Sequence, residues 1–331
     1  MKTDGLHGGI AIKPVAIALA AALGAAASHA PLPARAADGV YGEEAAKTVP
    51  IADAHFHVAP FMAVADLPGH MDRNGIRWAG GAGNPGGPGR TAEVVATLGK
   101  RYIFFTGQGE WIGLKQAGGP RALENGDSAA FKAALENIER GLRDRDARVI
   151  GEIHINTLQS APNNLLRHKI RADAPTLKAL FDLAAKYKRP MNVHAQWDTD
   201  TAEEIERLAA SNRGGRLVLS HCGSTAHAAD IRAVFERNAN VSCDLSFRSE
   251  PQLRGPMLGY AVFGRGDLRS EWKKLIEDYP DRFMVGIDDV QSWGEYEEVV
   301  RNIRSGLLAN LSPAAAEKVA YRNAVALFGL E

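Results

Sequence analysis

The feature that most constrains the fold of this chain is an alternation between short apolar runs and longer amphipathic segments. The apolar runs predict strands at Ile51–Val58, Ile76–Ala79, Tyr102–Thr106, Val149–Ile155, Met191–Ala195, Leu217–Ser220, Asn240–Leu245 and Phe283–Ile287. Such alternation predicts parallel strands joined by crossover helices. Eight units predict an α/β fold, a (β/α)8 TIM barrel, with an open doubly wound sheet as the competing arrangement because it shares the same local pattern.

The amphipathic segments between these runs predict helices. They lie at Ala129–Arg143, Thr176–Tyr187, Ala202–Ser211, Ala226–Asn238 and Arg269–Tyr279. Their apolar residues recur three and four positions apart, which is the spacing of one helix face. Two segments after the last strand, Tyr296–Leu308 and Pro313–Phe328, predict extra C-terminal helices.

Three longer connections follow strands and are expected at the catalytic face of a barrel. They are the stretches 80–89, 111–127 and 247–267. The first is rich in glycine but lacks the lysine of a phosphate-binding loop, so it predicts a flexible loop rather than a nucleotide site.

The first 36 residues predict a secretory signal peptide. Lys2 and Lys13 precede an apolar run from Pro14 to Ala27, and small residues give cleavage sites after Ala30 or Ala36. The run is shorter than the roughly 20 residues needed to span a bilayer, so no stable membrane anchor is expected. The mature chain, residues 37–331, is then one barrel domain that is exported to the periplasm or secreted.

The charge and the cysteine content exclude several classes of protein. The 39 basic and 39 acidic residues give a net charge of zero without a basic block, so nucleic acid is not expected as a partner. Cys222 and Cys243 are too few for a disulfide-stapled scaffold or a four-cysteine zinc site. A bridge between them stays open, with two buried thiols the expected state. The expected partner is a small-molecule substrate, and a homo-oligomer is compatible with the sequence.

Four histidines stand at the ends of three predicted strands. His55 and His57 close the first strand, His194 closes the fifth and His221 closes the sixth. Side chains alternate along a strand, so His55 and His57 point the same way and are separated by about 6 to 7 Å along the strand axis. Because the carboxyl ends of barrel strands meet at one face, these imidazoles are expected to converge.

The eighth predicted strand ends in Asp288 and Asp289. A carboxylate at a buried strand end is costly unless it is paired or bound to metal, and Asp288 is the expected ligand of the two. Imidazoles and a carboxylate without thiolates favour a catalytic site for a divalent metal, with zinc the expected ion.

This arrangement resembles the amidohydrolase superfamily, in particular its amidohydrolase-2 branch. The resemblance covers the chain from Ile51 onward, and the run from Tyr321 to Ala324 is similar to the closing helix of that branch. It implies that the metal is held by His55, His57, His194 and Asp288. It also implies that His221 is either a second-metal ligand or a catalytic group.

Three further residues are candidates for the site. Glu152, in a Gly-Glu-Ile run similar to that of the TatD-like branch, is expected to bridge two metals or to orient a ligand imidazole, and both roles stay open. His154 lies two residues on, faces the same way and is a candidate substrate contact. Arg248, just past the seventh strand, is a candidate for holding a substrate carboxylate through its planar fork.

Together these residues predict a metal-dependent hydrolase of an ester, lactone or amide, with one or two divalent ions. Asp288 is the expected proton shuttle, and His221 is expected to stabilise the oxyanion or to complete a second metal site. Two alternatives stay open: a non-oxidative decarboxylase of the same superfamily, and an exported metal-binding barrel without turnover.

Overall fold

The fold is known from a computed structural model, which describes Met1 and residues 39–59, 61–82, 87–159, 164, 166–254 and 260–331. Apart from Met1, the predicted signal peptide lies outside the described residues. The described residues from Gly39 to Glu331 belong to one compact unit. Among the described residues, no helix has both the length and the apolar character that a membrane crossing requires.

Eight parallel strands follow one another around a barrel in chain order. They are β1 (Ile51–Phe56), β2 (Ile76–Gly81), β3 (Tyr102–Gly107), β4 (Val149–Asn156), β5 (Pro190–Ala195), β6 (Arg216–Leu219), β7 (Val241–Asp244) and β8 (Phe283–Met284). The barrel closes where the amide groups of Ile287 and Asp288 donate to the His55 carbonyl at 3.0 and 2.7 Å. The predicted TIM barrel is therefore confirmed, and the doubly wound sheet is excluded.

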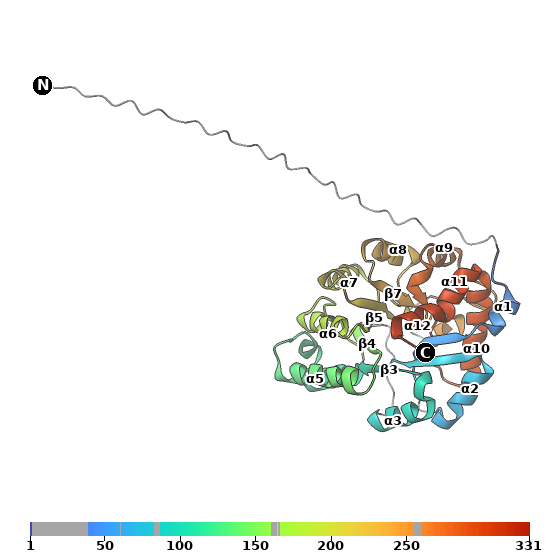
Figure 1. Cartoon of the computed structure of the whole chain (residues 1–331), viewed down its shortest axis with the longest axis horizontal. Coiled ribbons are helices and arrows are strands. Elements are labelled where there is room, and N and C mark those ends of the chain that lie inside the picture. The colour runs from blue at the N-terminus through green and yellow to red at the C-terminus, as the bar shows by residue number, and fades with distance from the viewer. Residues whose placement is uncertain (2–38, 60, 83–86, 160–163, 165, 255–259) are drawn as a thin grey trace. The chain divides into compact units, whose positions relative to one another are not determined.

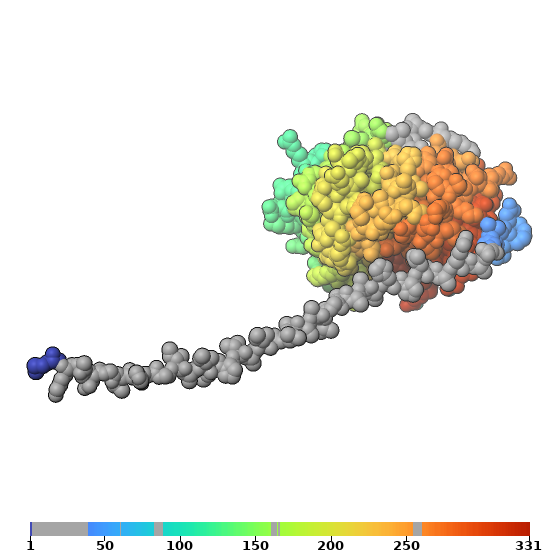
Figure 2. Space-filling model, turned by 90° about the horizontal axis from the view of Figure 1, so that it is seen from above, coloured from blue at the N-terminus to red at the C-terminus, as the bar shows by residue number. Residues whose placement is uncertain are grey.

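Helices surround these strands (Figure 1). They are α1 (Glu43–Thr48), α2 (Leu67–Arg73), α3 (Gly87–Leu98), α4 (Gln108–Gly118), α5 (Ala129–Asp144), α6 (Pro175–Lys186), α7 (Thr199–Ser211), α8 (Ala228–Arg237), α9 (Ser270–Asp278), α10 (Trp293–Asn302), α11 (Pro313–Glu317) and α12 (Asn323–Phe328). In Figure 2 the surface colours pass from green through yellow to orange in adjoining bands, because successive units are neighbours in space.

The helix α5 shows why these segments become helices. The Ser128 hydroxyl caps its first turn by accepting from the Phe131 amide at 3.1 Å. Phe131, Ala134, Ile138 and Leu142 recur three and four residues apart and are all buried against the strands.

All three long connections are partly helical. The stretch 111–127 contains most of α4 and a 3-10 turn, Pro120–Leu123, and the stretch 247–267 contains the 3-10 turn Glu250–Arg254. The glycine-rich stretch 80–89 ends in the first turn of α3. Glycine content concealed α3, since glycine is a poor helix former but does not forbid a helix start. The predicted C-terminal helices are present, with π-helical turns at Ile303–Leu307 and Lys318–Arg322.

The C-terminal helix α12 closes the end of the barrel where the strands begin. Phe328 is only 1% exposed and belongs to an apolar cluster with Ala52, Trp78 and Met284. This cluster fills one end of the barrel, so the polar residues at the opposite, carboxyl ends of the strands face the open mouth.

Candidate metal centre

The structure brings every predicted metal ligand into one cluster at the carboxyl ends of the strands. The residues are His55 in β1, His57 after it, Glu152 in β4, His194 in β5, His221 in the 3-10 turn Ser220–Cys222 after β6, and Asp288 after β8. His57 is partly exposed and the others are buried. They form three overlapping sets, each with ligand atoms within 4.8 Å of one another.

The first set is His55, His57 and Asp288. His55 Nε2 lies 3.3 Å from His57 Nε2, and Asp288 Oδ1 lies 3.6 Å from the first nitrogen and 3.3 Å from the second. Ligands at the usual zinc–nitrogen distance in a tetrahedral site are about 3.3 Å apart. The donor set and its spacing therefore fit a divalent metal ion.

The other two sets share Glu152. Its Oε1 lies 2.9 Å from His194 Nδ1 and 3.5 Å from His221 Nε2, whereas its Oε2 lies 3.3 Å from His154 Nε2 and 3.7 Å from His57 Nε2. His194 falls in a set with Glu152 and His154 rather than with Asp288. The two carboxylate oxygens thus face different imidazoles.

Two of the candidate ligands adopt a left-handed backbone conformation. His221 has φ of 54° and Asp288 has φ of 71°, a region that residues with a side chain occupy at a cost. The conformations are held by hydrogen bonds from the His221 amide to Asp244 Oδ1, at 3.0 Å, and from the Asp288 amide to the His55 carbonyl, at 2.7 Å. Such strain is a frequent property of functional sites.

The electrostatics of the cluster favour the binding of a cation. Burial lowers the pKa of His55, but the carboxylates of Asp244, Glu152 and Asp288 outweigh it and raise that pKa to about 10. Burial raises the pKa of Glu152, but the neighbouring His55 and His194 imidazoles hold it well below the usual range. The Glu152 carboxylate is therefore ionised and attracts positive charge to the centre.

Asp244, at the end of β7, is a site residue that the sequence analysis missed. Its Oδ2 lies 3.2 Å from His55 Nδ1, and its Oδ1 accepts from the His221 amide at 3.0 Å. Burial raises the pKa of Asp244, but His55 lowers it to about 2. A carboxylate that orients a ligand imidazole in this way fixes which ring nitrogen faces the metal. Its position at a buried strand end, like that of Asp288, is the signal that could have identified it.

His154 lies beside this cluster in the predicted orientation. It is level with His194 in the β4–β5 pairing, and its Nδ1 is buried without a hydrogen-bond partner among the described residues. Its carbonyl accepts from Trp111 Nε1 and from His168 Nε2, both at 2.9 Å. These contacts fix the backbone, and Nε2 of the ring faces Glu152, so Nδ1 is the ring atom that could contact a substrate. The predicted substrate contact stays a prediction.

Arg248 does not extend a free guanidinium toward the cluster. The side chain is 1% exposed and donates to the carbonyls of His221 at 2.8 Å, Ala226 at 3.0 Å and Tyr260 at 3.2 Å. Its fork is occupied by the backbone that carries His221, and this placement favours a positioning role over the predicted contact with a substrate carboxylate.

Cys222 and Cys243 are both buried free thiols, as expected. Burial raises the pKa of the Cys222 thiol well above its usual range, which leaves it uncharged.

A barrel with imidazoles and carboxylates at its mouth defines the class of metal-dependent barrel enzymes. A model of the amidohydrolase family, Amidohydro_2, matches residues 52–330, and the chain belongs to this family. The comparison with curated proteins gave no match.

Solved structures similar to this chain include an uncharacterised TIM-barrel protein from Bordetella bronchiseptica, with 14% identity and a TM-score of 0.52 over 81% of this chain and 83% of that one. Another is an amidohydrolase from Burkholderia multivorans with bound zinc, with 16% identity and a TM-score of 0.50 over 85% of this chain and all (100%) of that one. At such identities the likeness concerns the fold alone.

Proposed function

We propose that this protein is a metal-dependent hydrolase that cleaves an ester, lactone or amide bond of a small molecule. The observation that carries the proposal is the set formed by His55, His57 and Asp288, whose ligand atoms lie 3.3 to 3.6 Å apart at the barrel mouth. A divalent ion bound there, zinc in this proposal, would lower the pKa of water toward about 7 and polarise a carbonyl group.

In this proposal Asp288 holds and moves a proton. Its Oδ1 faces the nitrogens of His55 and His57, whereas its Oδ2 lies 3.5 Å from His221 Nδ1. One oxygen is thus directed at the metal ligands, and the other is directed at a second titratable group. In the proposed mechanism Asp288 accepts the proton of the attacking water and delivers it to the leaving group.

His221 is proposed to stabilise the negative charge that develops on the carbonyl oxygen. The Ser246 hydroxyl lies 2.8 Å from His221 Nδ1. Burial lowers the pKa of His221, but the nearby Asp288 carboxylate raises it, and the pKa is raised overall. A buried, fixed donor stabilises such charge more strongly than water does. His154, which is partnered at Nε2 by Glu152, is the proposed contact to the substrate.

The test is to load the protein with zinc or manganese and to assay a panel of aryl esters, lactones and amides together with hydroxybenzoic acids. We expect acid release without carbon dioxide release, and its loss on chelation. Carbon dioxide release alone would identify a decarboxylase. Metal-loaded protein that turns over neither class would identify a barrel without catalytic activity.

The variant Asp288→Asn separates metal binding from proton transfer. An amide has a similar shape and coordinates through oxygen, but it does not accept a proton at neutral pH. We expect turnover to fall about 100-fold or more, and metal content to fall much less. Asp289→Asn is the matched control and should keep most of the activity. Full turnover in metallated Asp288→Asn would remove Asp288 from the mechanism.

A further inference from the structure

The end of the barrel opposite the candidate metal centre carries an arginine at or beside the start of six strands. They are Arg77, Arg101, Arg148, Arg189, Arg216 and Arg282. Asp72 pairs with Arg101, and Asp146 pairs with Arg148 and Arg189. Arg216 and Arg282, in contrast, form no close ion pair within the part of the chain that the structure describes, although the Asp281 carboxylate acts electrostatically on Arg282.

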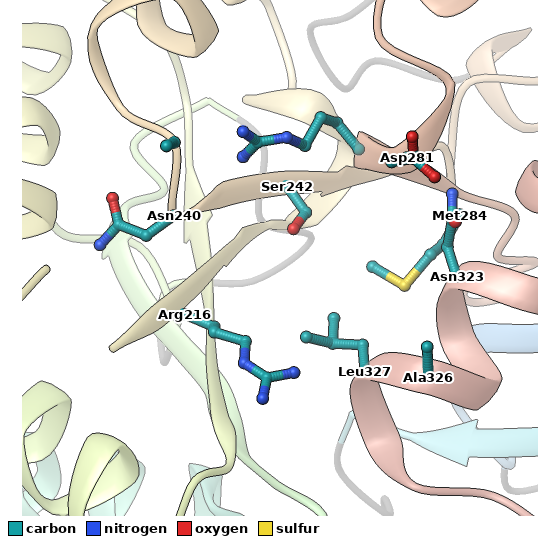
Figure 3. A pocket seen from close by; sticks show the side chains of 10 residues that line it. Arg216, Asn240, Ser242, Asp281, Met284, Asn323, Ala326 and Leu327 are labelled. Carbon is teal, nitrogen blue, oxygen red and sulfur yellow. The ribbon is translucent and has the colours of Figure 1, made fainter. Parts of the chain in front are cut away.

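Arg216 and Arg282 line the same cavity, which has a volume of about 310 Å³. Figure 3 shows the side chains of Arg216 from β6, Ser242 from β7 and Leu327 from α12 around this space. Met284 and Leu327 supply the apolar part of its lining. A cavity of this size and composition suits a small ligand with one charged group and a short apolar body.

The charges in this cavity do not balance. Arg282 is half-buried and donates to the Val241 carbonyl at 2.8 Å, and burial lowers the pKa of its guanidinium. The acid that lines the cavity, Asp281, already pairs with Lys318 at 2.8 Å. Two guanidinium groups therefore line the cavity with one carboxylate, and Lys318 shares that carboxylate. This leaves an excess of positive charge, so a bound anion would stabilise this end of the barrel.

We propose that this cavity binds a small organic acid. Its carboxylate would pair with Arg216, whose planar fork matches the two oxygens, and its apolar body would lie against Met284 and Leu327. The site is separate from the candidate metal centre, because Arg216 begins β6 whereas His221 follows its far end.

Titration calorimetry of the metal-loaded protein with hexanoate, hexanamide and inorganic phosphate tests the proposal. Hexanoate should bind with a Kd of about 1 mM or below, and both hexanamide, which lacks the charge, and phosphate, which lacks the apolar body, should bind at least about tenfold more weakly. Absence of saturable hexanoate binding would overturn the proposal. If phosphate bound as tightly as hexanoate, the apolar body of the ligand would contribute nothing to binding, and the proposed ligand class would be wrong.

Arg216→Gln identifies where hexanoate binds. Arg216 is exposed, so its replacement should leave the thermal midpoint unchanged while it weakens hexanoate binding about tenfold or more. Arg213→Gln is the matched control, because Arg213 donates to Asn238 Oδ1 and does not line the cavity. Hexanoate that binds at the metal centre instead would be unaffected by Arg216→Gln, and this result would contradict the proposal.

Discussion

At the scale of single residues, Glu152 is the side chain whose geometry most directly bears on the number of metal ions. Both of its oxygens lie within 3.7 Å of two or more imidazole nitrogens, and the two oxygens face different imidazoles. A carboxylate that only orients a ligand usually directs one oxygen at one ring. The arrangement therefore supports the bridging role, which the sequence had left equal to an orienting role.

The prediction for Glu152 is a metal count. The wild-type protein should bind two equivalents of zinc or manganese. Glu152→Ala should lose at least one of them, because each of the two ligand sets that contain Glu152 then lacks one ligand. Elemental analysis after gel filtration measures the metal content per chain. Glu136→Ala is the control, because Glu136 is exposed. One equivalent in the wild-type protein, weakened about 10- to 100-fold in Glu152→Ala, would indicate the orienting role instead.

Arg248 gives a second prediction at this scale. Lysine keeps the charge but offers no planar fork for the carbonyls of His221, Ala226 and Tyr260. Arg248→Lys should therefore lower stability by about 3 kcal/mol and lower the bound metal as well. Thermal unfolding and elemental analysis measure the two effects, with Arg232→Lys as control. A raised KM with unchanged unfolding and unchanged metal content would restore the predicted substrate contact.

At the scale of elements, the sequence predicted the strands better than the connections. The apolar runs locate all eight strands because barrel strands are buried on both faces. The strand β8 is only Phe283–Met284, and its predicted remainder to Ile287 meets β1 through single hydrogen bonds rather than a continuous ladder. The helix α4 was missed because Gly109, Gly113 and Gly118 interrupt its pattern. For Asp244 the position at a buried strand end was the available signal, but its contacts with His55 on β1 and with His221 after β6 were not predictable, because sequence periodicity carries no information on such distant contacts.

The connection before α6 carries a prediction on acid stability. Asp173 is 5% exposed and accepts from Arg207 in α7 at 2.7 Å and from Arg171 at 2.8 Å. Burial raises the pKa of Asp173, but the two arginines outweigh it and lower that pKa below its usual value. A lowered pKa in the folded state means that the carboxylate stabilises the protein above about pH 4 and that this contribution is lost as the pH falls through the folded-state pKa.

At pH 7, Asp173→Asn should therefore have a free energy of unfolding about 1 to 2 kcal/mol lower than that of the wild-type protein. This difference should shrink toward pH 2. Urea titrations of both proteins across this range measure the effect, and the exposed Asp144→Asn should not differ from the wild-type protein. An equal difference at every pH would show that the charge of Asp173 contributes nothing.

At the scale of the whole molecule, the two ends of the barrel have opposite chemistry. Carboxylates and imidazoles gather where the strands end, and arginines gather where the strands begin. The strands β6, β7 and β8 join the two ends, since each runs from the organic-acid cavity toward His221, Asp244 or Asp288.

The final prediction concerns where this molecule acts. We propose that the chain is exported, since Lys2 and Lys13 precede an apolar run and small residues follow at Ala30 and Ala36. N-terminal sequencing of the protein from its native host should give a first residue at Pro31 or Ala37, in the periplasmic or secreted fraction. Fusion of residues 1–36 to a reporter should export the reporter, and Leu19→Arg in that fusion should prevent export, because a charge in the middle of the apolar run abolishes the signal. Intact Met1 in the cytosolic fraction would contradict export, whereas the metal centre and the barrel fold, which begin at Ile51, would be unaffected by that result.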